Sequence, residues 1–293
     1  MLKVEGLVVP LITPLNSDET LDETGLERMI DYVIAGGVSG IFVLGSSGEF
    51  FSLDDATKER LVRAARSYIG GRVSLLVGIS EAATRQTIQQ GKRLVHLGAD
   101  ALVATAPYYY PHPPSELISH FLTIARAFDA PTILYNIPQM VKVSLDPETV
   151  QRLAEEPSII GIKDSAGDMS VFEQYLKIPN FAVTQGAETT AAQSVLMGAA
   201  GLVVGMANIA PGLCRAMFDA AKAGDKATAQ SHQAQLMALF PINQQKSWVA
   251  GLKMAAHLLG LCSPNLTAPF APLSEAQIGV IRQTLIQTGL LEA

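Results

Sequence analysis

The sequence is poor in cysteine and in charged residues, and each shortage argues against a class of protein. Cys214 and Cys262 are the only cysteines among 293 residues, which argues against a disulfide framework and favours a reducing compartment. Charged residues make up only 16% of the chain, and the formal net charge is −6 without a basic block. Nucleic-acid binding is therefore disfavoured, because phosphate contacts need clustered lysine and arginine.

Long apolar runs and targeting signals are also missing. No apolar stretch approaches the roughly 20 residues that are needed to span a bilayer. The first ten residues, MLKVEGLVVP, contain no run long enough for the core of a signal peptide. We therefore expect a soluble, cytoplasmic protein that interacts with neither membranes nor nucleic acids.

Metal-binding and nucleotide-binding motifs are absent as well. The five histidines show no metal-ligand spacing, and the chain contains neither an H-E-x-x-H motif nor a P-loop. The early G-x-G-x-x-G turn that doubly wound dinucleotide-binding sheets usually need is also missing. We predict that the protein uses no metal and no nucleotide cofactor.

Apolar residues, in contrast, make up 48% of the chain and recur in eight short β-rich runs. The runs begin at Leu7, Gly40, Val73, Ala101, Thr132, Ile159, Phe181 and Gly201. They are apolar almost throughout rather than alternating, which is typical of strands buried on both faces of a parallel sheet.

Helical patterns lie between these runs. Residues 26–34 place apolar side chains at helical spacing. Ser52 with Asp55 resembles a capping box at the start of the next helix. Asp146 followed by Pro147 predicts an N-cap with proline in the first turn.

Eight strands that are each followed by a helix favour a closed (β/α)8 TIM barrel over an open doubly wound sheet, which is the alternative. The strand patterns stop after about residue 210, and we expect helices at 211–223, 225–239, 247–259 and 274–289. The first of these would complete a catalytic barrel domain over residues 1–224. The other three would form a C-terminal helical extension, residues 225–293, packed on the barrel.

Lys163 stands out because it follows a wholly apolar stretch at the end of the sixth predicted strand. Barrel active sites lie at the carboxyl ends of the strands. Lysine is almost never fully buried without a partner, and burial favours the neutral amine that attacks a carbonyl. The pattern predicts a nucleophilic lysine; the alternative is a lysine paired with a carboxylate on a neighbouring strand.

Polar residues close three other strands. Tyr135 ends the fifth strand, next to Lys163, where a phenol suits either an acid–base role or a capping role. Ser46 and Ser47 follow the second strand in the turn GSSGE, which suits a bound carboxylate or a tight turn without ligand. Prolines hold PYYYPHPP, which contains Tyr109, extended after the fourth strand, and the segment suits a surface anchor, a subunit contact or a functional role.

The motifs GSSGE, PYYY, YNIP and GIKDS occur in this order at the ends of strands two, four, five and six. Together they resemble the dihydrodipicolinate synthase / N-acetylneuraminate lyase family, and the similarity extends over nearly the whole chain. The resemblance implies a class I aldolase-type mechanism, in which Lys163 forms an imine with the carbonyl of pyruvate or of a longer 2-oxo acid. Family members are commonly homotetramers built from dimers, so we expect the same assembly here.

The resemblance also implies roles for the residues around the imine. Tyr135 matches the general acid/base, Ser46 matches the residue that links the tyrosines in a proton relay, and Tyr109 matches the relay tyrosine that a neighbouring subunit inserts. The other matches are substrate-binding positions: Ser47 and Gly48 at the carboxylate, Gly186 and Val203 near the imine, and Ser165 and Glu188 toward the hydroxyls of a sugar-acid tail.

Two methionines depart from patterns within the family. Met140 lines the predicted site where dihydrodipicolinate synthases carry an arginine, two residues after the proline of YNxP. A methionine cannot form the bidentate contact to a second carboxylate, so aspartate semialdehyde is a poor candidate. Met206 is expected to face the region where sialic acid lyases place a polar residue.

The leading hypothesis is a pyruvate-dependent aldolase, a carbon–carbon lyase, that cleaves or makes a 2-oxo-3-deoxy sugar acid. The segment GEFFSL also resembles the 5-dehydro-4-deoxyglucarate dehydratase branch of the family, a carbon–oxygen lyase that eliminates water and CO2. Dihydrodipicolinate synthase, disfavoured by Met140, is a further alternative. The last alternative is a non-catalytic barrel that binds a 2-oxo acid.

Overall fold

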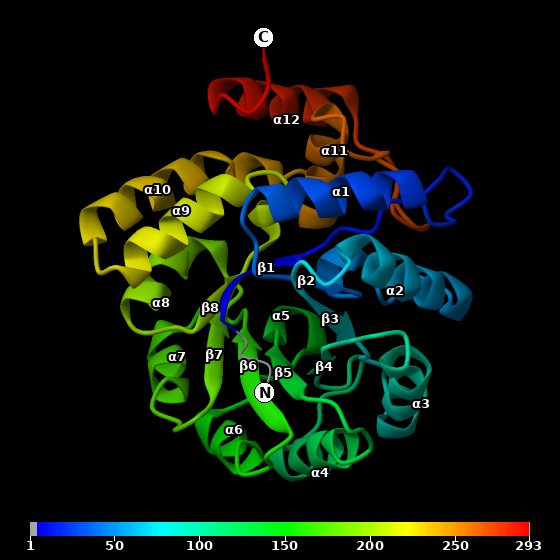
Figure 1. Ribbon diagram of the computed structural model, residues 1–293, viewed down its shortest axis with the longest axis vertical. Helices are drawn as coiled ribbons and strands as arrows, with labels where there is room; N and C mark the ends of the chain where they lie inside the picture. The colour runs from blue at the N-terminus through cyan, green and yellow to red at the C-terminus, as the bar shows by residue number, and fades with distance from the viewer. Residues whose placement is uncertain (1–4, 293) are drawn as a thin grey trace.

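The computed structural model describes residues 5–292, and these form a closed barrel of eight parallel strands (Figure 1). Each strand pairs with the next in the chain, and β8 returns to pair with β1. The predicted (β/α)8 barrel is confirmed, and the alternative of an open doubly wound sheet is wrong.

The eight strands coincide with the eight apolar runs of the sequence. Their bounds are β1 (Gly6–Pro10), β2 (Gly40–Val43), β3 (Ser74–Gly78), β4 (Ala101–Thr105), β5 (Thr132–Asn136), β6 (Ile159–Asp164), β7 (Ala182–Gln185) and β8 (Gly201–Val203). Nearly every strand residue is buried, because the barrel interior covers one face and the surrounding helices cover the other. The apolar runs extend past the carboxyl ends of several strands, where the chain leaves the sheet and forms the loops of the site.

Helices follow the strands and cover the outside of the barrel (Figure 1). They are α1 (Glu23–Ala35), α2 (Asp55–Ile69), α3 (Thr84–Val95), α4 (Pro114–Ala125), α6 (Pro147–Leu153), α7 (Met169–Tyr175), α8 (Ala191–Leu196) and α9 (Pro211–Lys222). The single-turn helix α5 (Pro138–Val141) instead follows β5 at the carboxyl end of the barrel, inside the ring of outer helices. The predicted cap at the start of α6 is confirmed, because the Asp146 side chain accepts a hydrogen bond from the backbone N–H of Thr149.

The capping box predicted at Ser52 and Asp55 is wrong. The N-cap of α2 is Asp54, whose side chain accepts from the backbone N–H of Thr57 at 2.7 Å. The Ser52 hydroxyl is engaged elsewhere, because it lies 2.7 Å from the hydroxyl of Thr267 in the C-terminal extension.

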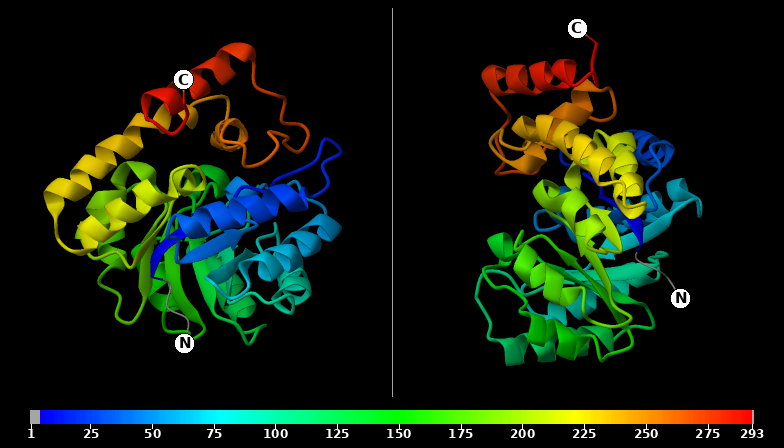
Figure 2. Two further views of the ribbon diagram at one scale, coloured as in Figure 1. Left: turned by 45° about the horizontal axis from the view of Figure 1, so that its top comes forward. Right: turned by 90° about the vertical axis from the view of Figure 1, so that its left-hand side faces the viewer.

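After α9 the regular elements among the residues up to 292 are all helices, as the sequence predicts. These are α10 (Lys226–Ala238), the short 3-10 helix η4 (Phe240–Ile242), α11 (Trp248–Leu258) and α12 (Glu275–Gln287). Helix α10 packs along α9 (Figure 2). Helix α11 contacts both the short 3-10 helix η1 (Ser46–Gly48) after β2 and the 3-10 helix η3 (Gly205–Asn208) after β8. The extension therefore lies against the end of the barrel where the strands finish. A domain boundary at residue 224 stays a prediction.

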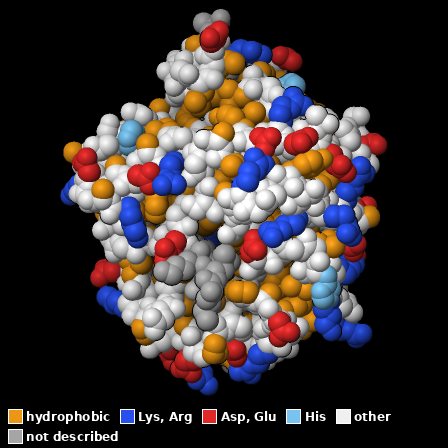
Figure 3. All heavy atoms as spheres, viewed as in Figure 1, with side chains coloured by type: hydrophobic (Ala, Val, Ile, Leu, Met, Phe, Trp, Pro, Cys, Tyr) orange, Lys and Arg blue, Asp and Glu red, His pale blue; other side chains and the backbone are white. Residues whose placement is uncertain are grey.

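One continuous apolar core joins the barrel to the extension. Lysine, arginine and acidic side chains are interspersed over the face of the molecule that Figure 3 shows. Within residues 5–292, no helix combines the length and the hydrophobicity that crossing a membrane requires.

Candidate active site

The side chain of Lys163 lies against two aromatic rings at the carboxyl end of the barrel. Its Nζ is 3.9 Å from the ring centroid of Tyr135 and 5.3 Å from that of Phe42. Only 5% of Lys163 is exposed, and it lines a cavity of about 330 Å³ together with Tyr135. Lys163 forms no ion pair with any residue from 5 to 292, so the alternative of a lysine paired with a neighbouring carboxylate is wrong for this part of the chain.

A polar pair one residue further along the same strands fixes the ends of β5 and β6. Asn136 and Asp164 are register partners, and the Asn136 amide donates to Asp164 Oδ1 at 2.7 Å. Burial raises the pKa of the Asp164 carboxyl, while the hydrogen bond from Asn136 opposes that shift. The side-chain oxygen of Asn136, Oδ1, also accepts from the backbone N–H of Leu145 at 3.0 Å. These contacts hold the two strands in the register that sets Tyr135 beside Lys163.

Gly186 leaves room for the lysine. A Cβ atom at this position would lie 3.0 Å from Lys163 Cε and would collide with Ser165 Oγ. The backbone N–H of Gly186 donates to the carbonyl oxygen of Asp164 at 2.6 Å, which brings the loop after β7 close to β6. Glycine is therefore needed at this position for close packing around the amine.

The turn GSSGE forms the 3-10 helix η1, and both of its serines are buried and line the Lys163 cavity. Gly48, predicted to bind substrate, does not line the cavity. It packs on the loop after β1, where a Cβ would lie 3.1 Å from the carbonyl oxygen of Leu11. Thr13 Oγ1 donates to the Gly48 carbonyl oxygen at 2.8 Å. The lack of a side chain at Gly48 thus lets the serine turn pack closely against the loop after β1.

The other predicted substrate-binding residues Met140, Ser165, Glu188 and Val203 also line the Lys163 cavity, as does Gly186. Met206 does not line it: the side chain is fully buried and only its backbone N–H approaches Glu188. The structure adds lining residues that the sequence analysis did not identify: Gln139, Thr189, Phe240, Asn243 and Trp248. The last three belong to the C-terminal extension, which contributes no strand to the barrel, so the strand-end pattern does not mark them. Trp248 is the only tryptophan of the chain, and this rarity is the one sequence feature that could have pointed to its place in the cavity.

Glu188 holds the loop after β8 in place. Its Oε1 accepts from the backbone N–H of Gly205 at 2.8 Å and from that of Met206 at 3.4 Å. Burial raises the pKa of Glu188, and these backbone hydrogen bonds oppose the shift. The carboxyl group is therefore fixed at the wall of the Lys163 cavity.

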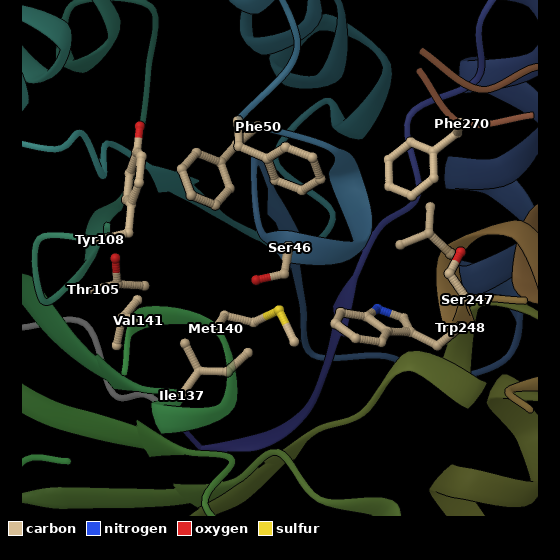
Figure 4. A pocket seen from close by; sticks show the side chains of 12 residues that line it. Ser46, Phe50, Thr105, Tyr108, Ile137, Met140, Val141, Ser247, Trp248 and Phe270 are labelled. Carbon is tan, nitrogen blue, oxygen red and sulfur yellow. The ribbon is translucent and has the colours of Figure 1, made fainter. Parts of the chain in front are cut away.

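A second cavity of about 510 Å³ adjoins the first (Figure 4). The two share a wall made of Ser46, Ile137, Met140 and Trp248. The remaining lining of the second cavity is mostly apolar: Phe50, Phe51, Thr105, Tyr108, Val141, Ser247, Val249 and Phe270. In Figure 4 Ser46 and Met140 lie near the centre, between Tyr108 on one side and Trp248 on the other.

The neighbouring tyrosines of PYYY point in different directions. Tyr108 is half-buried, and its hydroxyl donates to Glu81 Oε2 at 3.2 Å. Burial, reinforced by the Glu81 carboxylate, raises the pKa of Tyr108 to about 12. Tyr109 has a left-handed backbone with φ of +84° and is 85% exposed. Tyr109 lines neither cavity, so a single chain does not bring it to Lys163.

Fold and site together define a (β/α)8-barrel enzyme centred on a buried lysine that forms no ion pair with the part of the chain described, residues 5–292. A family model described as the dihydrodipicolinate synthetase family matches residues 3–288, and the chain belongs to this family. As a member it is a carbon–carbon lyase of the class I aldolase type.

Relatives of similar length support the assignment. The chain is 35% identical to 4-hydroxy-tetrahydrodipicolinate synthase of Nitrosomonas eutropha, over 97% of this chain and 98% of that protein. It is 31% identical to an uncharacterized DapA-like lyase of Halobacterium salinarum, over 99% of this chain and 96% of that protein.

Two similar solved structures contain pyruvate. One is the chloride-inhibited dihydrodipicolinate synthase of Acinetobacter baumannii, with 30% identity and a TM-score of 0.95 over 98% of this chain and 100% of that one. The other is YagE, a prophage protein of the dihydrodipicolinic acid synthase family from E. coli K12, with 29% identity and a TM-score of 0.94 over 98% and 99%.

Proposed function

We propose that the enzyme forms an imine between Lys163 Nζ and the carbonyl carbon of pyruvate or of a longer 2-oxo acid. The observation that carries the proposal is the buried amine, 3.9 Å from the Tyr135 ring centroid and in one cavity with Ser46 and Ser47. The pyruvate complexes of two similar structures support the same substrate class. In this arrangement the serine turn receives the carboxylate through its hydroxyls and backbone N–H groups.

The reaction follows from the chemistry of the imine. Attack by the amine and loss of water give a protonated imine, which withdraws electrons from C3 of the substrate. The C3–C4 bond then breaks, its electron pair forms the enamine, and the C4 hydroxyl loses its proton as the aldehyde departs. In this proposal Tyr135 donates its proton to the water that leaves as the imine forms, and its phenolate then takes the proton of the C4 hydroxyl. The phenol returns this proton to C3 of the enamine, and hydrolysis of the imine releases pyruvate from Lys163 and restores the phenol.

We further propose that Tyr109 acts in the site of a neighbouring copy, within a homotetramer. Its left-handed backbone and the exposed tyrosine next to it, Tyr110, support this, because residues other than glycine rarely adopt that conformation and adjacent exposed aromatic residues mark contact surfaces. Mixing inactive Lys163→Ala with inactive Tyr109→Phe tests the idea. Active hybrids are expected, since a Lys163 from one chain would then meet a Tyr109 from the other. No regain of activity, with mixed oligomers verified by mass spectrometry, would show that Tyr109 does not act across subunits.

For the rest of the substrate, we propose a 2-oxo-3-deoxy sugar acid that yields an uncharged aldehyde. The polar lining of the Lys163 cavity, formed by Gln139, Ser165, Glu188, Thr189 and Asn243, suits a hydroxylated tail. Asn243 Oδ1 is buried without a hydrogen-bond partner among the described residues, and a substrate hydroxyl would satisfy it.

The charge of the lining weighs against an anionic tail. Among the described residues that line either cavity, Lys163 is the only cation and Glu188 is the only acid. Met140 offers no positive charge to a second carboxylate. Aspartate semialdehyde and the diacid of the dehydratase alternative are both less favoured for this reason. Aspartate semialdehyde is nevertheless included in the substrate test, because relatives of this chain are named 4-hydroxy-tetrahydrodipicolinate synthase.

A product assay separates these activities. The purified enzyme is incubated with a panel of 2-oxo-3-deoxy acids, and pyruvate and CO2 are measured separately, with Lys163→Ala as the control. The proposal expects pyruvate and an aldehyde in equal amounts from a monocarboxylic sugar acid. CO2 without pyruvate would instead identify a dehydratase. Condensation of pyruvate with aspartate semialdehyde as the preferred reaction would identify a synthase and contradict the proposed tail.

A further inference from the structure

A fully buried ion pair joins the serine turn to the C-terminal extension. Glu49 directly follows Ser46–Gly48 and has a left-handed backbone with φ of +57°. Its Oε1 lies 2.5 Å from Nζ of Lys253, which belongs to α11. Both side chains have 0% exposure. No other hydrogen-bond donor among the described residues reaches Oε1, so Lys253 alone compensates this oxygen.

The second carboxylate oxygen binds another part of the extension. Glu49 Oε2 accepts from the backbone N–H of Thr267 at 2.9 Å and from its hydroxyl at 2.8 Å. Lys253 Nζ in turn donates to the carbonyl oxygen of Asn265 at 2.6 Å. The hydroxyl of Ser52 lies 2.7 Å from that of Thr267. One carboxylate thus ties the end of the serine turn to both α11 and the segment around residue 267.

The ion pair lies between two walls of the active site without touching its interior. Ser46 and Ser47 line the Lys163 cavity from the serine turn. Trp248, the first residue of α11, lines it from the C-terminal extension. Neither Glu49 nor Lys253 lines either cavity. Their effect on a bound molecule is therefore indirect and passes through the elements that they connect.

Stability alone is a weak reason for such a pair. Taking two charges out of water costs about as much as their attraction returns, and apolar residues of similar volume often stabilise a core equally well. A short, fully desolvated ion pair between a turn and a helix instead fixes the turn relative to the helix. Displacing either partner would leave a buried charge uncompensated. Burial lowers the pKa of Lys253, and the Glu49 carboxylate opposes that shift.

We propose that Glu49 and Lys253 are positioning residues for substrate binding, which set Ser46 and Ser47 at the distance from α11 that a 2-oxo acid carboxylate requires. This proposal rests on the imine chemistry proposed above. It gives the C-terminal extension a part in substrate binding, since Lys253 and Thr267 of the extension both hold Glu49 at the end of the carboxylate-binding turn. Loss of the pair shifts the serine hydroxyls and weakens binding, while Lys163 keeps its contacts with Phe42 on β2 and Tyr135 on β5.

The test measures borohydride trapping of pyruvate on Lys163 as a function of pyruvate concentration. Glu49→Gln removes the charge but keeps an acceptor for Thr267. We expect the half-saturating pyruvate concentration to rise at least about tenfold, and the trapping rate at saturation to fall much less. The double variant Glu49→Gln with Lys253→Met removes both charges. It should regain thermal stability and still need more pyruvate, because the turn is no longer fixed.

Asp100→Asn is the matched control. It weakens the Arg66–Asp100 pair, whose atoms are 3.2 Å apart where β4 begins, at the opposite end of the barrel from the site. The melting temperature should fall without a change in half-saturating pyruvate. Unchanged half-saturation in the folded double variant would show a purely structural pair and overturn the proposal. Absence of any adduct in the unsubstituted enzyme would overturn both the imine chemistry and this proposal. An adduct that forms with unchanged half-saturation in the double variant would overturn only the positioning role, so the two failures are distinguishable.

Discussion

Tyr135 and Lys163 are register partners on β5 and β6, and the lysine Nζ lies 3.9 Å from the centroid of the tyrosine ring. The phenol and the amine therefore line the same cavity from adjacent strands. Strand pairing alone produces this proximity, and the bonded pair Asn136 and Asp164 at the next register position secures it.

Replacing Tyr135 with phenylalanine should separate imine formation from proton transfer. The ring keeps its packing against Lys163 and Phe42, while the acidic hydroxyl is lost. We expect the turnover rate to fall by about 10²–10⁴-fold, the usual contribution of a positioned acid–base group. Borohydride should still trap pyruvate on Lys163. An unchanged turnover rate, measured by pyruvate release, would show that the hydroxyl transfers no proton.

Gly186→Ala should impair the lysine directly. The new Cβ would lie 3.0 Å from Lys163 Cε and against Ser165 Oγ, so the amine must move away from its position. We expect kcat/KM to fall by about 10²-fold, because misplacing a reacting group by about 1 Å can reduce the rate by that factor. Gly212→Ala is the control, because nothing lies within 4 Å of a Cβ at that position. Equal activity in the two variants would contradict the role given to Gly186.

Met140→Arg should change which aldehydes the enzyme accepts. Met140 is 47% exposed and lines both cavities, so an arginine fits there with its guanidinium toward the substrate tail. We expect kcat/KM for aldehydes that carry a carboxylate to rise about tenfold relative to neutral aldehydes, because a charge-assisted hydrogen bond contributes that much. Met140→Leu keeps the apolar character and should leave the preference unchanged. A preference for anionic aldehydes in the unsubstituted enzyme would refute the uncharged tail.

The conformational stability should fall as the pH drops from about 6.5 to about 4. Burial lowers the pKa of His120 to about 4, from a usual value of 6.5, with a further contribution from His112. Between these two pH values the unfolded chain binds a proton that the folded chain does not, so protonation favours unfolding. The contribution of His120 is up to about 3 kcal/mol and is fully present above pH 6.5.

His120→Asn is the corresponding test. Asparagine keeps a polar group for the Thr84 hydroxyl, which lies 2.9 Å from His120 Nδ1, but does not titrate. Urea unfolding at pH 7 and pH 4.5 should show a smaller loss of stability in this variant. An identical loss in both proteins would assign the acid sensitivity to other groups.

The barrel could be predicted from the sequence because its signal is local. Each strand is a short apolar run, and Lys163, Tyr135 and the two serines of η1 stand where strands end, which is where barrel sites lie. Ser52 has the sequence pattern of a helix cap, whereas its hydroxyl contacts that of Thr267, more than two hundred residues away. Nothing near Ser52 in the sequence carries that information.

The remaining parts of the site depend on contacts between distant segments. Trp248 and Asn243 reach the cavity because α11 packs on η1 and η3, and no strand-end pattern marks them. Glu49 belongs to a motif that was recognised, yet its role appears only with Lys253, which looks like an ordinary residue of a helix. Gly48 was assigned to the substrate, whereas its neighbours are Leu11 and Thr13.

Reductive trapping at Lys163 tests the central claim most directly. The enzyme is treated with borohydride in the presence of pyruvate, digested, and the modified peptide is located by mass spectrometry. We predict one irreversible pyruvate-derived adduct on Lys163, loss of activity in step with its formation, and no adduct in folded Lys163→Ala. An unmodified Lys163 under saturating pyruvate, or an adduct on another lysine that accompanies inactivation, would contradict the imine mechanism.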